Sequence, residues 1–333
     1  AGQFVFLNQK KRFNWGIGFS HIPYYSGFAW LDVDSLTLGN KKIEVLTHNT
    51  DIFRTFEDQF SISGAFPFSQ TRRVEMGASY SFYYNTHERF TEYYDSLGYL
   101  IGYRHKKRLP AEKGFQAGNF YLAWVGDNSQ FGVASPLRGH RFRFEASKYM
   151  GVINMNSLLG DFRKYFRFAP FTFASRNMFM GRYGQDAESG LLPPLYLGYP
   201  ELIRGYNALQ YAEGGSGSSL SINDLIGSRM YVTNFELRYP LTGPERLSGI
   251  KSRFLFTELN LFTDGGVAWG NSAFLQNDPK DQINRVSKFI WSSGVSLRVN
   301  LFGYLIVEPY YAIPWQNGGF KNKTFGVNVI PGF

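Results

Sequence analysis

Residues 72–84 read Arg-Arg-Val-Glu-Met-Gly-Ala-Ser-Tyr-Ser-Phe-Tyr-Tyr, with apolar and polar side chains in alternation. A period of two places one set of side chains on each face of a β-strand. The stretch is longer than the five or six residues of an ordinary strand, and it is long enough for a tilted strand that crosses a bilayer. One face carries Val74, Met76, Ala78, Tyr80, Phe82 and Tyr84.

The same alternation recurs along the whole chain and predicts an all-β fold with about 13 strands. Residues 23–56 are ambiguous, because they fit either a hairpin inside a long loop or two further strands. The predicted strands cover residues 3–7, 13–22, 60–66, 72–84, 116–125, 137–149, 158–168, 171–180, 229–239, 252–264, 288–301, 304–313 and 320–330.

Composition agrees with an all-β protein. Aromatic residues make up 18% of the 333 residues and charged residues another 18%, and the mean hydropathy is −0.26. No apolar run approaches the 18 or so residues of a transmembrane helix. The aromatic excess fits either a large β core or the aromatic girdles of a transmembrane barrel. Alternation cannot separate these, because a membrane barrel inverts the inside and outside of a soluble sandwich.

The spacing of the predicted strands favours a transmembrane antiparallel β-barrel. Short and long connections alternate, as expected for short periplasmic turns and long external loops. The chain also ends on an aromatic residue, Phe333, directly after its last strand. The longest connections are residues 23–56, 85–115, 181–227 and 265–287, and the turns include 8–12, 67–71, 126–136, 169–170, 240–250 and 301–303.

The strand count makes a further prediction about the start of the barrel. A bacterial barrel has an even number of strands with both ends in the periplasm, and 13 strands do not satisfy this. Either residues 23–56 hide extra strands, or the first strands precede Ala1, which we favour. Ala1 is not a Met, as expected of a mature or truncated product. Residues 1–333 are expected to form a single outer-membrane barrel domain.

Charge and reactive residues narrow the function. The net charge of +9 fits Lys and Arg in a polar lumen, or contact with outer-membrane lipid headgroups and lipopolysaccharide phosphates. No nucleic-acid motif is present, and the absence of Cys excludes disulfides and zinc ribbons. We expect no catalytic residues, no metal and no cofactor, because the histidines lie in no recognisable catalytic or metal-binding spacing. They are His21, His48, His87, His105 and His140, of which His87 beside Glu88 is expected in a solvated loop.

The long connection 181–227 contains Glu201-Leu202-Ile203-Arg204-Gly205-Tyr206. Loops of this length are functional or disordered, and the triplet Arg204-Gly205-Tyr206 suggests a folded tip. The alternative is an ordinary surface loop with a chance Arg-Gly-Tyr. The Ser-Gly run 214–219 is not a nucleophile elbow, because no buried strand leads into it.

Three motifs in order resemble the BamA/TamA superfamily, also called bacterial surface antigen barrels. Ile203-Arg204-Gly205-Tyr206 is similar to the family's (V/I)RG(F/Y) motif in its sixth external loop. Residues 235–241, Phe-Glu-Leu-Arg-Tyr-Pro-Leu, are similar to its E-L-R-(F/Y)-P strand. Phe262, Asp264 and Gly266 fall in a stretch that resembles its F-x-D-x-G motif. Residues 12–16, 126–129 and 136–141 resemble, more loosely, the branch that follows a TolB-like propeller.

The resemblance implies a sixteen-stranded barrel in the cell outer membrane of a Gram-negative-type cell, with three strands upstream of Ala1. It implies non-enzymatic insertion or translocation of client outer-membrane or surface proteins, with periplasmic or lipoprotein accessory subunits. The alternatives are a structural barrel that anchors an upstream periplasmic or propeller domain, and a passive pore. What precedes Ala1 would discriminate among them, since periplasmic POTRA domains favour assembly and a propeller favours anchoring.

The resemblance also directs attention to the partners of Arg204. Glu236 and Asp264 are expected on the polar faces of adjacent strands, where inward carboxylates repel each other and need a cation. Arg204 has the planar fork that pairs with carboxylates, so we predict that the loop folds into the lumen and binds both. The alternative is that wall arginines such as Arg238 or Arg298 pair with these carboxylates.

The last strand departs from the usual assembly signal of such barrels. Gly326 is followed by an apolar run and then by Pro331-Gly332-Phe333. Proline has no N–H to donate to a neighbouring strand. Gly326, Pro331 and Phe333 are therefore predicted to border a seam that is weakly paired, although Pro331 can also simply end the strand.

Overall fold

The computed structural model describes residues 1–38, 41–95, 97–101, 105–206, 222–270, 288–303, 305–316, 319–320 and 323–331. These residues divide into two compact units. Unit 1 comprises residues 1–64, 77–120 and 150–152, and unit 2 comprises residues 65–76, 121–149 and 153–333. The prediction of a single barrel domain stays a prediction.

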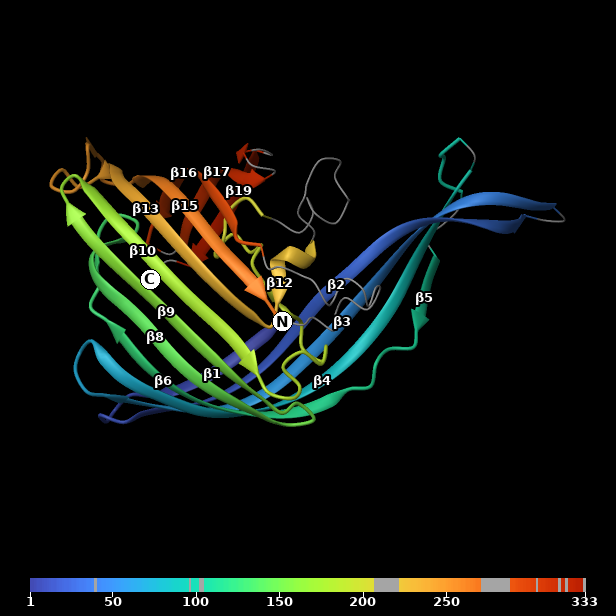
Figure 1. The fold of residues 1–333 in the computed structure, drawn as a ribbon, viewed down its shortest axis with the longest axis horizontal. Coiled ribbons are helices and arrows are strands. Elements are labelled where there is room, and N and C mark those ends of the chain that lie inside the picture. The colour runs from blue at the N-terminus through green and yellow to red at the C-terminus, as the bar shows by residue number, and fades with distance from the viewer. Residues whose placement is uncertain are drawn as a thin grey trace. The chain divides into compact units, whose positions relative to one another are not determined.

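The described residues are almost entirely β-structure, which confirms the predicted all-β antiparallel fold (Figure 1). Short elements are β5 (His105–Leu109), β7 (Gln130–Phe131), β11 (Leu195–Tyr196), β12 (Ile226–Gly227), β14 (Ile250–Lys251), β18 (Gly319–Phe320) and the 3-10 helix η1 (Ile222–Leu225). None of the helical residues described forms a helix long and apolar enough to cross a bilayer.

Thirteen strands in the described part of the chain have seven residues or more, in agreement with the sequence expectation. They are β1 (Gly2–Asn8), β2 (Asn14–Leu38), β3 (Lys41–Pro67), β4 (Arg72–Tyr94), β6 (Phe115–Asp127), β8 (Pro136–Gly151), β9 (Met155–Phe168), β10 (Phe171–Tyr183), β13 (Arg229–Gly243), β15 (Phe256–Trp269), β16 (Ile290–Leu301), β17 (Leu305–Gln316) and β19 (Thr324–Pro331).

Unit 1 contains strands that are far longer than a membrane crossing needs. β1 pairs antiparallel with β2, and β2 and β3 have 25 and 27 residues. At about 3.3 Å per residue β3 spans about 90 Å, whereas about ten residues cross a bilayer. Residues 23–38 and 41–56 therefore continue β2 and β3, so the arms of the expected hairpin are parts of these two strands and are not enclosed in a loop. β4 likewise continues through residues 85–94, which the sequence predicts to be a loop.

Charged side chains pair along the extended part of unit 1. Arg89 donates to both oxygens of Asp51 at 2.6 and 2.9 Å, and the Nε2 atom of His87 lies 2.8 Å from the same carboxylate. Glu88 pairs with Arg54 at 2.6 Å and with Lys106 at 2.8 Å. The sequence-based interpretation of His87 and Glu88 as solvated loop residues was wrong, because β4 continues past them and neighbouring strands supply partners.

Unit 2 contains a run of strands in which each pairs antiparallel with the next one along the chain. The run comprises β8, β9, β10, β13, β15, β16, β17 and β19 (Figure 1). β15 reaches Trp269, so residues 265–269 belong to the strand and not to the following loop. β10 likewise extends to Tyr183, beyond its predicted end at Met180.

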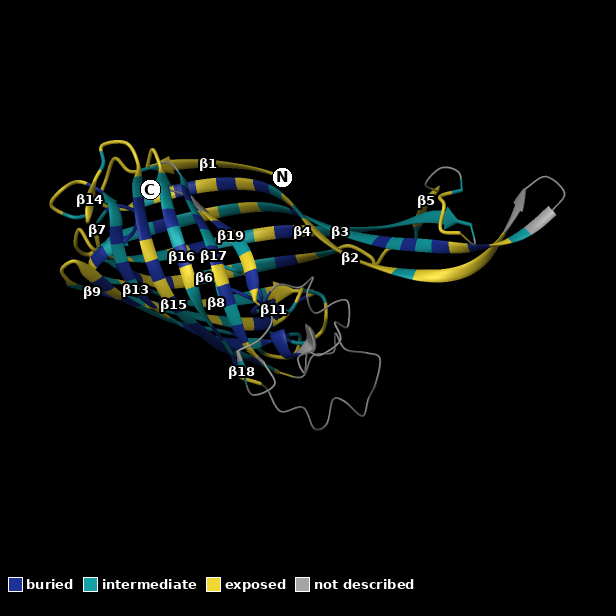
Figure 2. Ribbon diagram, turned by 90° about the horizontal axis from the view of Figure 1, so that it is seen from above, coloured by how far each residue is buried: buried dark blue, intermediate teal, exposed yellow. Residues whose placement is uncertain are grey.

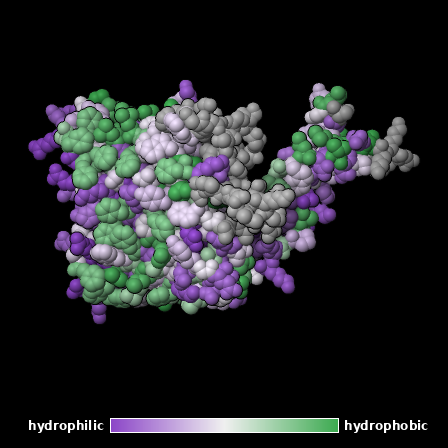
Figure 3. All heavy atoms as spheres, viewed as in Figure 1, coloured by the Kyte–Doolittle hydropathy of each residue, from purple (hydrophilic) through white to green (hydrophobic). Residues whose placement is uncertain are grey.

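The two faces of this sheet have inverted polarity. The exposed face is apolar, and the buried face is polar and charged; Figure 2 shows buried and exposed positions alternating along the strands. Figure 3 shows hydrophobic residues spread over the surface of β9, β10 and β13. Exposed positions include Phe166, Phe168, Phe173, Phe235, Leu259, Leu261, Val295, Tyr311, Val327 and Val329. Buried positions include Glu236, Arg238, Glu258, Asn260, Asp264, Ser292, Ser296, Arg298, Glu308 and Asn328.

The inverted polarity distinguishes a transmembrane sheet from a soluble sandwich, which the alternation of the sequence alone could not do. A contiguous apolar face is unfavourable in water by about 25 cal/mol for each Å² exposed, whereas in hydrocarbon it is at no disadvantage. Charged side chains on the lipid side would be costly, and here they lie on the opposite side. The sheet of unit 2 is therefore built as a transmembrane β-sheet and not as half of a soluble sandwich.

Candidate functional site

The loop between β10 and β13 returns against the polar face of unit 2. Its two ends meet where β11 pairs antiparallel with β12, Leu195 opposite Gly227 and Tyr196 opposite Ile226. Residues 207–221, which include the Ser-Gly run 214–219, lie outside the described residues. The described part of the loop therefore carries the whole Ile203-Arg204-Gly205-Tyr206 motif.

An apolar cluster anchors the loop to the strands beside it. Ile203 and Tyr206 are fully buried there, with Leu197 and Leu225 from the same loop. The strands contribute Met178, Met230, Val232, Ala268 and Ile290. Gly266 of β15 permits the close approach, because a Cβ there would lie 2.7 Å from the Cδ1 atom of Ile203. Burial of these side chains is the general attractive force on the loop.

Gly205 takes a backbone conformation that other residues rarely adopt. Its φ is 95°, in the left-handed region that lacks a steric penalty only for glycine. A Cβ there would lie 3.1 Å from each of Ala312, Pro314 and Ser292. Glycine is thus required twice, for its φ and for the space between the loop and β16 and β17.

Tyr206 fixes the loop through its hydroxyl group. The hydroxyl donates to the backbone oxygen of Trp291 at 2.7 Å, and it lies 3.2 Å from the backbone oxygen of Trp315. It also accepts from the backbone N–H of Trp291 at 3.3 Å. The hydroxyl of the motif's aromatic residue therefore joins the loop to two strands, β16 and β17, while its ring is buried in the apolar cluster.

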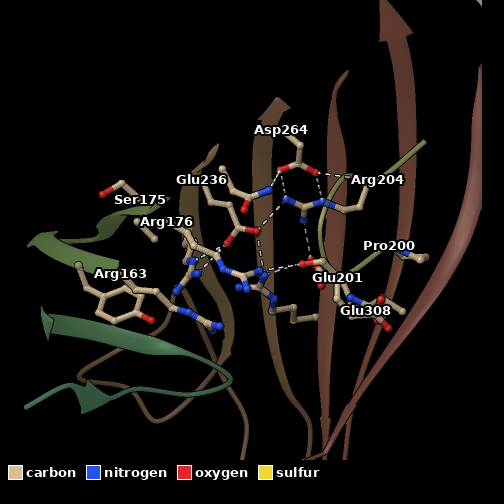
Figure 4. Close-up of a pocket in the computed structure, with 15 residues that line it drawn as sticks. Arg163, Ser175, Arg176, Pro200, Glu201, Arg204, Glu236, Asp264 and Glu308 are labelled. Atoms are coloured by element: carbon tan, nitrogen blue, oxygen red, sulfur yellow. Dashed lines mark hydrogen bonds and ion pairs between the residues drawn. The ribbon is translucent and has the colours of Figure 1, made fainter. Parts of the chain in front are cut away.

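Arg204 is the charged centre of the site (Figure 4). Its Nε and Nη2 atoms donate to the two oxygens of Asp264, each at 2.8 Å, and its backbone N–H donates to the same carboxylate at 3.1 Å. Nη2 also lies 2.9 Å from Glu236, and Nη1 donates to Glu308 at 3.0 Å. Only 4% of Arg204 is exposed, so these bonds replace nearly all of its hydration.

Two neighbours complete the surroundings of the guanidinium. Its carbon lies 3.6 Å from the ring centre of Phe262, close enough for a cation–π contact. Asn234 donates to Asp264 at 2.9 Å and to the backbone oxygen of Leu202 at 2.7 Å, which joins the strand to the loop a second time. Burial lowers the pKa of Arg204, but the charges of Asp264 and Glu236 outweigh it and raise the pKa above its usual value.

The wall arginines pair with one of the two predicted carboxylates, Glu236, so the two alternatives considered from the sequence are not exclusive. Arg238 binds Glu236 at 2.7 Å and Arg298 binds it at 2.9 Å, in addition to Arg204. Asp264 receives Arg204 together with Asn234. Glu236 is thus shared by three guanidinium groups, and Asp264 is the carboxylate that the loop engages most fully.

Sequence reasoning did not single out Glu308. It lies on β17, is 1% exposed, and receives Arg204, Arg298 at 3.3 Å and the hydroxyl of Ser296 at 2.7 Å. A signal was available, since Glu308 shares the alternate face of its strand with Ile306 and Tyr310. That signal is weak, because an isolated acidic residue in an apolar strand does not reveal its partner.

The remaining predicted residues lie apart from Arg204. Gly326 of β19 stands opposite Tyr310 in the register, and a Cβ there would collide with the Tyr310 ring. Pro331 ends β19 opposite Leu305, as a residue that ends or weakens pairing should. Phe333 lies outside the described residues. The seam therefore stays a prediction.

A cavity of about 250 Å³ lies beneath the loop. Its lining includes the loop residues Pro200 and Glu201 and the strand residues Arg163 and Arg176, which Figure 4 shows on the far side from Arg204. Arg176 reaches the loop directly, because it donates to the backbone oxygen of Glu201 at 2.9 Å. The site thus consists of a loop that occupies, but does not fill, the space over the polar face.

A transmembrane-type sheet with an Arg-Gly-aromatic loop bound to carboxylates on its polar face defines a class of membrane β-barrel proteins. The comparison with protein families identifies which one: residues 6–327 match the Omp85 superfamily domain. The chain therefore belongs to the Omp85 superfamily, which confirms the resemblance to the BamA/TamA type. The propeller branch stays a prediction.

Solved structures of two proteins are similar to this chain. BamA from Haemophilus ducreyi lacking POTRA domains 1–3 has 13% identity and a TM-score of 0.47, over 99% of this chain and 75% of that chain. CdiB from Acinetobacter baumannii has 12% identity and a TM-score of 0.46, over 95% of this chain and 53% of that chain. The chain thus spans about half the length of CdiB. No curated protein matches it.

Proposed function

We propose that this chain is the membrane-embedded part of an outer-membrane machine that inserts or translocates other polypeptides. The observation that carries the proposal is the binding of Arg204 to Asp264 on the polar face of a sheet whose other face is apolar and exposed. Membership of the Omp85 superfamily supports the same role. In this proposal the polar face lines the lumen of a barrel, and the loop occupies that lumen.

The proposed location is the outer membrane of a Gram-negative-type cell. The apolar face would contact lipid tails, and the excess of positive charge would favour lipid phosphates and lipopolysaccharide. Clients would be outer-membrane or surface proteins, and accessory subunits would be periplasmic proteins or lipoproteins. The work would be non-enzymatic, because strand insertion exchanges hydrogen bonds and requires no covalent step.

β19 supports a role for strand pairing. Phe325, Val327 and Val329 are exposed, whereas Thr324 and Asn328 on the alternate face are buried, so the strand has the faces of a membrane strand. Pro331 lacks the N–H that would extend its pairing. In this proposal a client strand pairs with β19 through its backbone, as peptides do in β-augmentation.

Two other functions give different expectations. A passive pore is disfavoured by the loop, since its apolar cluster and Arg204 occupy the polar face. An anchoring barrel has one observation in its favour: β2, β3 and β4 run far beyond the length of a bilayer crossing, and could hold a partner outside the membrane. Anchoring and insertion are distinguished by whether the chain accelerates the folding of a client protein into the membrane.

The test is insertion of a client into lipid vesicles. An eight-stranded outer-membrane barrel, unfolded in urea, is diluted into vesicles that contain this chain, and its folding is followed by heat-modifiable gel mobility. Acceleration over empty vesicles, and its reduction by Arg204→Ala in a chain that is itself folded, supports the proposal. An unchanged folding rate would favour anchoring, and steady ion conductance without client would favour a pore.

A further inference from the structure

We propose that residues 132–136, from the end of β7 to the first residue of β8, form a second inward segment that closes the opposite end of the lumen, and that Ser135 couples this segment to Arg204. The inference rests on the proposed function in one respect, namely that the polar face of unit 2 lines the lumen. The sequence predicts an ordinary turn at residues 126–136, and turns normally lie in solvent.

Burial shows that this stretch is not an exposed turn. Val133, Ala134 and Ser135 are only 5%, 3% and 4% exposed, and Leu137 after them is 7% exposed. The backbone N–H of Gly132 donates to the oxygen of Ser135 at 2.8 Å, which closes the stretch into a compact turn. The stretch is therefore a turn, as the sequence predicts, but its second half is buried and not exposed to solvent.

The segment binds the polar face through specific hydrogen bonds. The Ser135 hydroxyl donates to Glu258, whose oxygens lie 2.7 and 2.8 Å away, and accepts from Arg238 at 3.1 Å. Arg238 also donates to the backbone oxygen of Pro136 at 3.2 Å. The side chain of Asn300 donates to the backbone oxygen of Val133 at 2.9 Å. The hydroxyl of Ser135 thus donates to a carboxylate and accepts from a guanidinium group at the same time, which its one hydrogen and two lone pairs permit.

The segment and the loop lie at different levels of the same sheet. Arg204 binds Asp264, which stands opposite Asn234 and Ser292 in the register. Ser135 binds Glu258, which is six positions earlier on β15 and pairs with Arg298 and Pro240. Six residues of a strand correspond to about 20 Å. Loop and segment would therefore close the lumen from its two ends and leave the charged layer between them.

Two routes of ion pairs cross this layer from Arg204 to Ser135. The first runs through Glu236 and Arg238, at 2.9, 2.7 and 3.1 Å. The second runs through Glu308, Arg298 and Glu258, at 3.0, 3.3, 3.5 and 2.7 Å. Three guanidinium groups and four carboxylates are thus connected, and buried networks of this kind respond as a unit.

The balance of charge gives the coupling a direction. Loss of Arg204 removes one of three cations that serve four carboxylates, so Arg298 would be drawn towards Glu236 and Glu308. Its contact with Glu258 is the longest of the three, and would be the first to break. Glu258 would then be a buried carboxylate with too little compensation, which favours entry of water beside Ser135. Withdrawal of the loop should therefore loosen the segment.

The test measures the accessibility of the segment. The chain contains no Cys, so Ala134→Cys places one thiol in the segment without a background. The whole chain in lipid nanodiscs is treated with a charged maleimide that does not cross membranes. Slow labelling of Ala134→Cys is expected, with an increase of tenfold or more when Ser135→Ala, Arg204→Ala or Arg204→Gln is added. Arg204→Gln also removes the charge but keeps an N–H donor for the carboxylates, and serves if Arg204→Ala does not fold.

Two controls separate coupling from general loosening. Ala123→Cys on β6 is also in unit 2 and 1% exposed, and its labelling should stay slow in every variant. Arg253→Ala, at an exposed arginine, should leave the Ala134→Cys rate unchanged. Rapid labelling of Ala134→Cys alone, or a rate that responds to Ser135→Ala but to neither Arg204 variant, would overturn the inference. Failure of client insertion would not alter these rates, so the two proposals fail separately.

Discussion

Arg204 and Asp264 are sixty positions apart in the chain, and three hydrogen bonds join them on the polar face of unit 2. Two of the bonds form the parallel pair that a guanidinium and a carboxylate make best, and the third comes from the backbone. Because the backbone itself is bound, the loop is fixed in position and not merely attracted by charge.

The first prediction concerns the charge of the loop. Arg204→Ala leaves Asp264, Glu236 and Glu308 buried with less compensation, and removal of one partner from a buried ion pair costs about 3–5 kcal/mol. The midpoint temperature at which the heat-modifiable gel form is lost should fall clearly. Arg253→Ala is the matched control, with a change within about 0.5 kcal/mol. Equal midpoints for the two variants would contradict the role assigned to Arg204.

The second prediction concerns Gly205. Gly205→Ala combines a left-handed backbone, which costs about 1–2 kcal/mol, with crowding against Ala312 and Pro314. Gly303→Ala is a natural control, since its φ is 81° but a Cβ there meets nothing within 4 Å. Gly205→Ala should therefore lower the unfolding midpoint more than Gly303→Ala does. Equal shifts would mean that backbone strain alone matters and that the loop is not closely packed.

The third prediction concerns the hydroxyl of Tyr206. Tyr206→Phe keeps the buried ring and removes the donor to the Trp291 oxygen, for a loss of about 1–2 kcal/mol. Tyr311→Phe is the comparison, because Tyr311 lies on the exposed apolar face. Thermal unfolding followed by gel mobility checks the difference. A Tyr206→Phe variant as stable as Tyr311→Phe would show that packing alone holds the loop tip.

The fourth prediction tests the orientation of the sheet. Leu261 is 53% exposed in the middle of β15, where a soluble protein would accept lysine readily. In a bilayer, Leu261→Lys should cost about 2–4 kcal/mol near the midplane. The folded fraction in vesicles over a urea series measures this, with Leu301→Lys near the end of β16 as a milder control. If neither lysine substitution lowered the folded fraction, this face would be in contact with water.

The local sequence pattern was sufficient to predict the strands, because apolar and polar residues alternate with a period of two within each strand. The thirteen long strands appear in the expected order, and the motif residues Arg204, Asp264 and Glu236 come together. The prediction of a loop at residues 85–94 was wrong, and residues 23–38 and 41–56, which the sequence leaves open, continue β2 and β3. In β3 and β4 charge is paired across strands, as between Asp51 and Arg89.

The sequence by itself determined the antiparallel strands, their two faces and the positions of the loop motif, because these depend on neighbours along the chain. Only the tertiary structure decided that the apolar face is the exposed one, that Glu308 shares Arg204, and that Ser135 lies at the other end of the same network. Those relations join residues up to 123 positions apart. They depend on register and on how closely the loop and the strands approach, which no local period encodes.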